Sequence, residues 1–185
     1  MMTSRRARPL AVLGVILAVL AVGAVLTFGL DNRDALAASP LERRPAPTFT
    51  LPGLDGRPDS AVNLAKLRGH VVLVNFWASW CTECHTEQAA LNQTWERFRD
   101  AGVVVVGVNF EDARGDARRY VASTGASYPM VVDAKSATAL AYGLRGVPET
   151  YVIDARGRIV DRVIGPTTSS RLASTITDLL SGPGR

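Results

Sequence analysis

The chain has 185 residues, of which 47% are hydrophobic and 21% are charged, and its formal net charge is +4. Arg5, Arg6 and Arg8 supply three of the 21 basic residues, so the other 18 nearly balance the 17 acidic ones. The length suits one domain with an appendage. The near-balance of charge excludes a nucleic-acid-binding protein, which needs a concentrated basic patch.

The N-terminal part of the sequence predicts a membrane anchor. Residues 1–8 form a basic segment, and residues 9–30 carry no charged side chain. As a helix this stretch would extend about 33 Å, against a bilayer hydrocarbon core of about 30 Å. Because the basic residues precede the apolar stretch, we expect the N-terminus in the cytoplasm and the rest of the chain on the extracytoplasmic, periplasmic side.

The alternative to a retained anchor is a cleaved signal peptide. Ala35, Leu36 and Ala37 would fit a cleavage site, but a signal peptide usually has an apolar region of only about 7–15 residues. The longer stretch favours a single-pass anchor. Under both interpretations residues 31–44 are a linker, and residues 45–182 form a domain that works outside the cytoplasm.

Within the domain, apolar runs and turn residues alternate with helical patterns. Strands are predicted at residues 48–51, 71–77, 103–108, 130–132, 151–153 and 159–164. Helices are predicted at residues 86–100, 112–123, 136–142 and 169–180, with a single helical turn at 64–67. The first strand belongs to an edge hairpin or short strand pair, with turns near Gly53 and Gly56. This order indicates an α/β protein whose mixed sheet has helices on both faces.

The two cysteines of the chain lie three positions apart, at Cys81 and Cys84. Disulfides are common in exported proteins, but a bridge over so short a loop removes little entropy from the unfolded chain. The pair is therefore better suited to redox chemistry. At a strand-to-helix junction the helix N-terminus stabilises a thiolate. We expect an exposed Cys81 as the nucleophile and a shielded Cys84 as the resolving thiol.

Three polar neighbours of the cysteines have open interpretations. Glu83 either raises the pKa of the Cys81 thiol and favours a reducing couple, or simply faces solvent at the helix N-terminus. Glu87 is either a proton acceptor near the sulfurs or a solvated helix residue. His85 is a haem ligand, a cation that lowers the thiol pKa, or a surface residue.

The segment from Cys81 to His85 also matches the attachment signature of a c-type haem. A cytochrome would use His85 as one axial ligand and would have only His70 or Met130 as the other outside the anchor. The residues before the motif predict a buried strand, which disfavours a haem pocket. A metal site at Cys81, Cys84 and His85 lacks a fourth ligand. We therefore predict neither metal nor cofactor, only a redox-active disulfide.

A family resemblance supports the redox interpretation. Residues 75–84, Asn-Phe-Trp-Ala-Ser-Trp-Cys-Thr-Glu-Cys, resemble the active-site segment of the thioredoxin superfamily, and more narrowly of its membrane-anchored extracytoplasmic branch, the CcmG/DsbE, ResA and TlpA-like proteins. Further segments similar to that branch are residues 45–51, 105–110, 146–150 and 165–166. The resemblance covers residues 45–182.

The resemblance implies a thioredoxin-like fold with an N-terminal β-hairpin and an inserted β-α unit. It implies that Cys81 and Cys84 cycle between dithiol and disulfide, with Trp80 at their flank. It further implies that Pro148 is a cis-proline facing the dithiol. The backbone of Val147 would then pair with an extended substrate, and Glu149 would belong to an acidic rim that contacts it.

Two residues depart from the wider pattern. Glu83 stands where this family often has proline, so the reduction potential of relatives does not transfer. Asn75 stands where cytoplasmic thioredoxins carry a buried aspartate, which removes one candidate base. Glu87, in contrast, matches an acid that the family carries one turn after the second cysteine.

Taken together, the sequence predicts a monomeric thiol–disulfide oxidoreductase that reduces the Cys-x-x-Cys-His segment of apocytochrome c, or other exported thiol proteins, during cytochrome c maturation. Its electrons would come from a membrane dithiol transporter of the CcdA or DsbD type. The alternative is an oxidant that installs disulfides in exported proteins.

Overall fold

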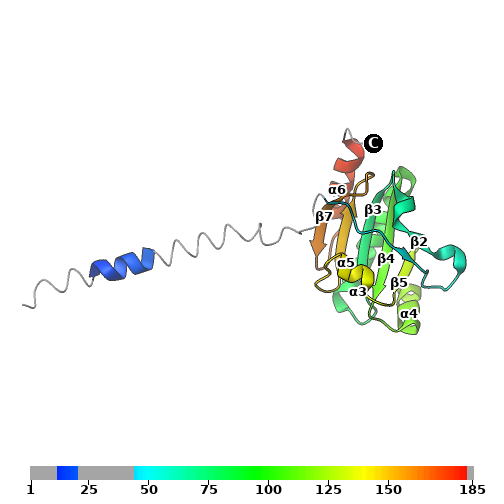
Figure 1. Cartoon of the computed structure of the whole chain (residues 1–185), viewed down its shortest axis with the longest axis horizontal. Coiled ribbons are helices and arrows are strands. Elements are labelled where there is room, and N and C mark those ends of the chain that lie inside the picture. The colour runs from blue at the N-terminus through cyan, green and yellow to red at the C-terminus, as the bar shows by residue number, and fades with distance from the viewer. Residues whose placement is uncertain (1–11, 21–43, 183–185) are drawn as a thin grey trace, which may run out of the picture. The chain divides into compact units, whose positions relative to one another are not determined.

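The computed structural model describes residues 12–20 and 44–182. The chain divides into two compact units, Met1–Pro40 and Leu41–Arg185. Residues 12–20 form a helix, drawn in blue in Figure 1. Across these two described ranges, no helix combines the length and the apolar character that crossing a membrane requires. The remainder of the predicted anchor, the alternative cleavage site and residues 31–43 of the predicted linker lie outside the described residues.

The second unit is built on a five-stranded mixed sheet with the strand order β5-β4-β3-β6-β7. Strands β3, β4 and β5 are parallel to one another, whereas β6 is antiparallel to both β3 and β7. The strands are β3 (Val71–Trp77), β4 (Val103–Phe110), β5 (Met130–Asp133), β6 (Glu149–Ile153) and β7 (Ile159–Ile164). All seven residues of β3 are buried, as expected for a central strand covered on both faces.

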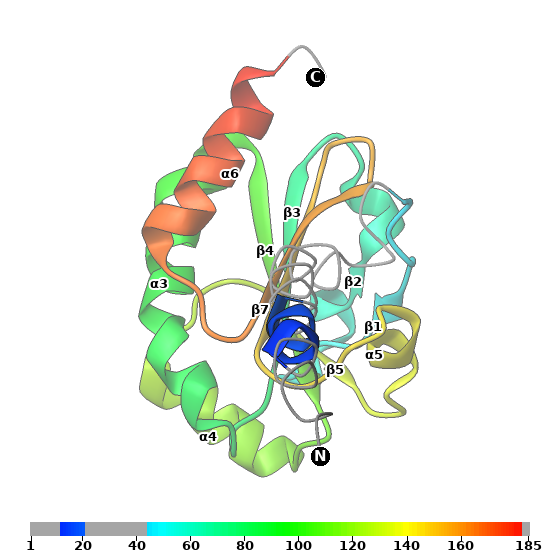
Figure 2. The ribbon, with the colours of Figure 1, turned by 90° about the vertical axis from the view of Figure 1, so that its left-hand side faces the viewer.

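Helices cover the two faces of the sheet separately (Figure 2). Val71 and Leu73 face one side, where they pack with apolar residues of α3 (Thr82–Phe98) and α6 (Ser169–Ser181). Val72 and Val74 face the other side, which is covered by α5 (Ala137–Ala141) and the N-terminal strand pair. The predicted α/β architecture, a mixed sheet between helices, is confirmed.

The N-terminal strand pair is more open than the turn residues predict. β1 (Thr50–Leu51) pairs antiparallel with β2 (Val62–Asn63), and the loop between them includes a short 3-10 helix, Pro58–Ser60. Together they form a separate two-stranded sheet. The strand pair is therefore confirmed. The predicted turn forms at residues 53–56, where the N–H of Gly56 donates to the carbonyl of Gly53 over 3.1 Å, but the chain continues through the 3-10 helix before it reaches β2. Residues 64–67 form the predicted single turn, as the 3-10 helix Leu64–Leu67.

The junction between β3 and α3 sets the position of both cysteines. β3 ends at Trp77, and α3 begins at Thr82 with Cys81 as its N-cap residue. The helix starts four residues earlier than residue 86, where the periodic pattern begins, because the Cys81 sulfur accepts a hydrogen bond from the backbone of Cys84. After α3 the chain forms a short 3-10 helix, Arg99–Ala101, and its C-cap residue Gly102 adopts a left-handed conformation, which glycine takes readily at such positions.

Candidate active site

Cys81 and Cys84 are joined by a disulfide at the N-terminus of α3. The backbone N–H of Cys84 donates to Cys81 Sγ over 3.1 Å. In the reduced protein the same N–H would point at the Cys81 sulfur, where the helix N-terminus favours negative charge. The local structure therefore suits Cys81 to form a thiolate, which is the attacking form of cysteine.

The expected exposure of Cys81 is wrong for the disulfide form. Cys81 is only 3% exposed and Cys84 1%. Both lie in a buried cluster with Trp77 and Tyr120, and Val147 packs against this cluster from the loop before β6. Cover from segments far away in the sequence thus shields the cysteine that the helix-cap position alone would leave open.

The segment before Cys81 is held by the loop that follows β4. The carboxylate of Asp112 accepts bonds from the backbone N–H of Ser79 (2.6 Å), from its hydroxyl (2.8 Å) and from Asn109 Nδ2 (2.9 Å). Trp80, next to Cys81, is 60% exposed, and its indole N–H donates to the carbonyl of Glu111 over 2.9 Å. Asp112 is a site residue that sequence reasoning missed, since nothing in the sequence distinguishes it from an ordinary helix-start aspartate.

Glu87 lies one turn beyond Cys84 and is 1% exposed. Its Oε1 accepts from Asn75 Nδ2 over 2.7 Å, and its Oε2 accepts from the backbone N–H of Thr167 over 3.0 Å. Burial raises the pKa of Glu87 to about 7, while these two hydrogen bonds act in the opposite direction. The burial of Glu87 excludes the solvated interpretation. Its role as a proton acceptor stays a prediction, which a raised pKa would suit.

Glu83 and His85 lie on the outer side of the first turn of α3, and both are exposed. His85 Nε2 lies 3.1 Å from the carbonyl oxygen of Ser79, and its ring meets Tyr120 edge-on at 4.6 Å. The hydroxyl of Tyr120 in turn lies 2.9 Å from the carbonyl oxygen of Cys84. His85 is thus a surface residue that connects the start of α3 to the segment before Cys81.

The loop before β6 carries the second part of the site. The Val147–Pro148 peptide bond is cis, the isomer that the resemblance implies. The carbonyl of Pro148 accepts from the N–H of Gly165 over 2.9 Å. The expected acidic rim at Glu149 is wrong, because this side chain is 1% exposed and forms a buried ion pair with Arg162. Contact of Val147 with a substrate stays a prediction.

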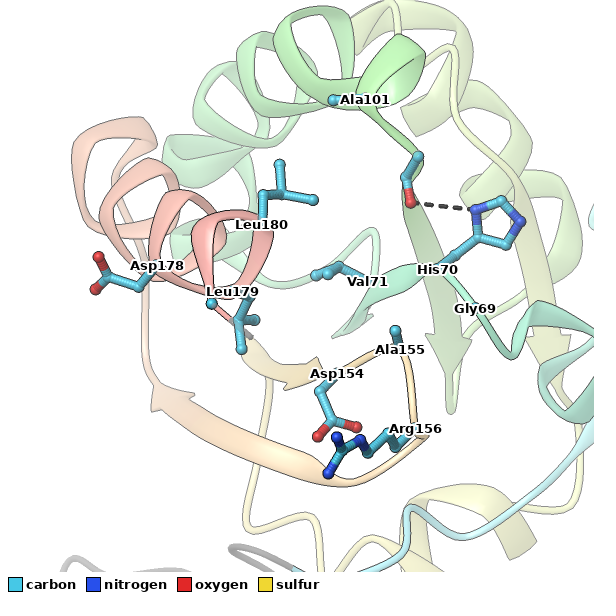
Figure 3. A pocket seen from close by; sticks show the side chains of 12 residues that line it. Gly69, His70, Val71, Ala101, Asp154, Ala155, Arg156, Asp178, Leu179 and Leu180 are labelled. Atoms are coloured by element: carbon cyan, nitrogen blue, oxygen red, sulfur yellow. Dashed lines mark hydrogen bonds between the residues drawn. The ribbon is translucent and has the colours of Figure 1, made fainter. Parts of the chain in front are cut away.

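A separate cavity of about 490 Å³ lies at the opposite end of the sheet (Figure 3). Residues 69–71, at the start of β3, line it together with the turn at 154–156 and residues 178–180 near the end of α6. The dithiol follows the last residue of β3, so this cavity is not part of the redox site. Among the residues described in both units, no group of three His, Cys, Asp or Glu side chains could hold a metal ion.

Comparison with known proteins identifies several relatives. A family model described as the AhpC/TSA family matches residues 43–162. The thiol:disulfide interchange protein DsbE of Allochromatium vinosum is 35% identical over 163 residues, which cover 88% of each chain. The thiol:disulfide interchange protein HelX of Rhodobacter capsulatus is 34% identical, over 84% of this chain and 86% of the relative. The crystal structure of a putative DsbE from Chlorobium tepidum superimposes with a TM-score of 0.69, at 32% identity over 76% of this chain and 98% of that one.

Proposed function

We propose a substrate for this chain, which belongs to the AhpC/TSA family and is a thiol–disulfide oxidoreductase. It reduces the disulfide of the Cys-x-x-Cys-His segment of exported apocytochrome c before haem is attached. The observation that carries thiol–disulfide exchange is the Cys81–Cys84 pair at a helix N-terminus, with a buried carboxyl group one turn away. The choice of substrate is supported by the resemblance of residues 45–182 to the extracytoplasmic branch of the superfamily.

The reaction takes two exchange steps. In the reduced enzyme the Cys81 thiolate attacks one sulfur of the substrate disulfide, so that a mixed disulfide forms and one substrate thiolate leaves. The sulfur of Cys84 then attacks Cys81 Sγ, which releases the second substrate thiolate and leaves the Cys81–Cys84 disulfide. Two electrons pass from the enzyme dithiol to the substrate, and the structure corresponds to the oxidised enzyme at the end of this half-cycle.

Glu87 serves as the proton acceptor for the second step. Cys84 must lose its proton before it can attack, and it is buried away from bulk water. Glu87 follows it on the buried side of α3, and a pKa of about 7 leaves this carboxyl group partly ionised at neutral pH. It can therefore take the Cys84 proton without holding it permanently.

The cellular setting is part of the same proposal. Residues 9–30 anchor the protein in the membrane as a single span, with the N-terminus in the cytoplasm, so that the dithiol works on the extracytoplasmic side. A membrane dithiol transporter of the CcdA or DsbD type returns the Cys81–Cys84 disulfide to the dithiol. Action as a monomer belongs to the same proposal, and it is compatible with exchange steps that need only the one dithiol.

Trapping the mixed disulfide tests the substrate assignment. A Cys84→Ser variant of the full chain, expressed in its host, cannot resolve the intermediate and retains its partner on Cys81. Apocytochrome c among the trapped partners, absent from a matched Cys81→Ser/Cys84→Ser control, supports the proposal. A broad set of exported proteins without apocytochrome c would instead indicate a general oxidant or isomerase.

A further inference from the structure

A buried ion pair lies directly behind the cis-proline loop. Glu149 Oε2 accepts from Arg162 Nη2 over 2.7 Å and from Nε over 3.0 Å. Both side chains are almost fully buried, and the guanidinium also lies 5.3 Å above the ring of Tyr151. The two residues come from neighbouring antiparallel strands, β6 and β7. The exchange chemistry of the cysteines uses neither of them.

The ion pair makes hydrogen bonds to the backbone of the segment that leads into Pro148. Glu149 Oε1 accepts from the N–H of Arg145 over 3.0 Å, and Arg162 Nη2 donates to the carbonyl of Gly143 over 3.1 Å. The hydroxyl of Tyr151 lies 2.9 Å from both Glu149 Oε2 and the carbonyl of Tyr142. Between α5 and β6 this segment has no helix or strand of its own, so these side chains supply partners that regular structure would otherwise provide.

Global stability does not explain a buried ion pair at this position. Removing two charges from water costs about as much as their attraction returns, and well-packed apolar residues often stabilise a protein equally well. What an apolar pair cannot provide is the bond to Arg145 N–H and the bond to the Gly143 carbonyl. The contribution specific to the charged pair is therefore the conformation of the loop.

The loop held in this way is in contact with the redox centre. Val147 packs against the cluster that contains Cys81 and Cys84. On the other face of β6, the hydroxyl of Thr150 accepts from Asn75 Nδ2 over 3.0 Å, and the same amide donates to Glu87. The ion pair thus fixes the loop that leads into β6, whereas Glu87 is held separately by Asn75 and the backbone of Thr167.

We propose that Arg162 and Glu149 are positioning residues that hold residues 143–148 in the conformation required to bind an extended peptide beside the dithiol. The proposal rests on the proposed function only in taking this loop as the peptide-binding segment. It adds that the charged pair determines how well a peptide disulfide binds, whereas a small disulfide that needs no loop contact reacts independently of the pair.

The test compares two disulfides in single turnovers of the full-length protein, which is first reduced with dithiothreitol and then freed of it. The limiting rate then gives kcat, and the half-saturating disulfide concentration gives KM. One is a synthetic disulfide-bonded peptide with a Cys-x-x-Cys-His segment, tested beside the same peptide with alanine in place of its histidine. The other is the small aromatic disulfide dithiobis(nitrobenzoate). In an Arg162→Met variant we expect KM for both peptides to rise by about tenfold or more, with kcat and the rate with the small disulfide within about twofold of wild type.

A double variant, Glu149→Leu/Arg162→Met, separates positioning from folding. It leaves no unpaired buried charge, so its melting temperature should exceed that of Arg162→Met, while its peptide KM stays raised. Arg162→Lys, which keeps the charge but loses the paired donors, should be intermediate in KM. Recovery of peptide KM in the double variant, or a parallel loss with both kinds of disulfide, would overturn the proposal.

The same data keep this proposal distinct from the proposed function. If wild-type protein reduces the histidine and alanine peptides equally well, the apocytochrome assignment loses support. The change in KM that Arg162→Met causes with both peptides would still test the positioning role of the ion pair.

Discussion

Replacing Glu87 by glutamine should change the stability of the oxidised protein with a sign that depends on pH. The pKa of Glu87 is raised from its ordinary 4.5 to about 7, so the folded state retains a proton that the unfolded state releases. The stability of the wild type therefore falls as pH rises from 4.5 to 7 and is unaffected by this group above that range. A shift of this size corresponds to about 3 kcal/mol.

Glutamine cannot ionise, so it removes the free-energy cost of a buried negative charge at residue 87, but it also loses a hydrogen bond. The two carboxylate oxygens accept from Asn75 and from the N–H of Thr167, whereas a glutamine amide has one oxygen and its nitrogen cannot accept. Losing one buried bond costs about 1–2 kcal/mol. Glu87→Gln should therefore be about 1 kcal/mol less stable than wild type at pH 4.5 and about 2 kcal/mol more stable at pH 8.

Urea unfolding of the oxidised protein at the two pH values measures this difference. Glu96→Gln is a matched control on the same helix, because Glu96 is about half exposed and its replacement should change the stability by only a few tenths of a kcal/mol at either pH. A stability difference for Glu87→Gln that stays constant between pH 4.5 and pH 8 would refute the perturbed carboxyl group and, with it, the proton acceptor.

Two further substitutions test the surroundings of the dithiol. Glu83→Gln should lower the pKa of the Cys81 thiol in the reduced protein, because a nearby negative charge is removed; an unchanged pKa in an ultraviolet thiolate titration would leave Glu83 as a solvent-facing residue. Gly107→Ala should lower the free energy of unfolding by about 1–3 kcal/mol, because the added Cβ would lie 3.0 Å from Trp77 Nε1 and even closer to Met130 Sδ. Thermal unfolding measures this loss. An unaltered melting temperature would show that the Met130 side chain moves aside without cost.

The central strand and the dithiol junction could be predicted from the sequence because their signals are local. An unbroken apolar run specifies β3 without knowledge of its neighbours. The N-cap position of Cys81 follows from the same short segment, although the periodic pattern of α3 begins only at residue 86, four residues after the helix does. The residues around Pro148 were assigned by resemblance, and the cis bond at that position agrees with it.

The surroundings of the cysteines could not be predicted, because they come from distant parts of the chain. The helix spacing puts Glu87 one turn from Cys84, but its burial depends on Asn75 and on Thr167, which is 80 positions away. Likewise, Arg162 is an ordinary strand arginine in the sequence, and only the pairing of β6 with β7 brings it to Glu149.

The reduction potential of the Cys81–Cys84 couple tests the proposed direction of electron flow most directly. Equilibrating the protein with defined dithiothreitol or glutathione buffers and counting free thiols gives this potential. For a reductase we expect a reducing couple, between about −270 mV, typical of thioredoxin, and about −180 mV. A potential near −120 mV, typical of a strong disulfide oxidant, would contradict the reductase and favour an enzyme that installs disulfides in exported proteins.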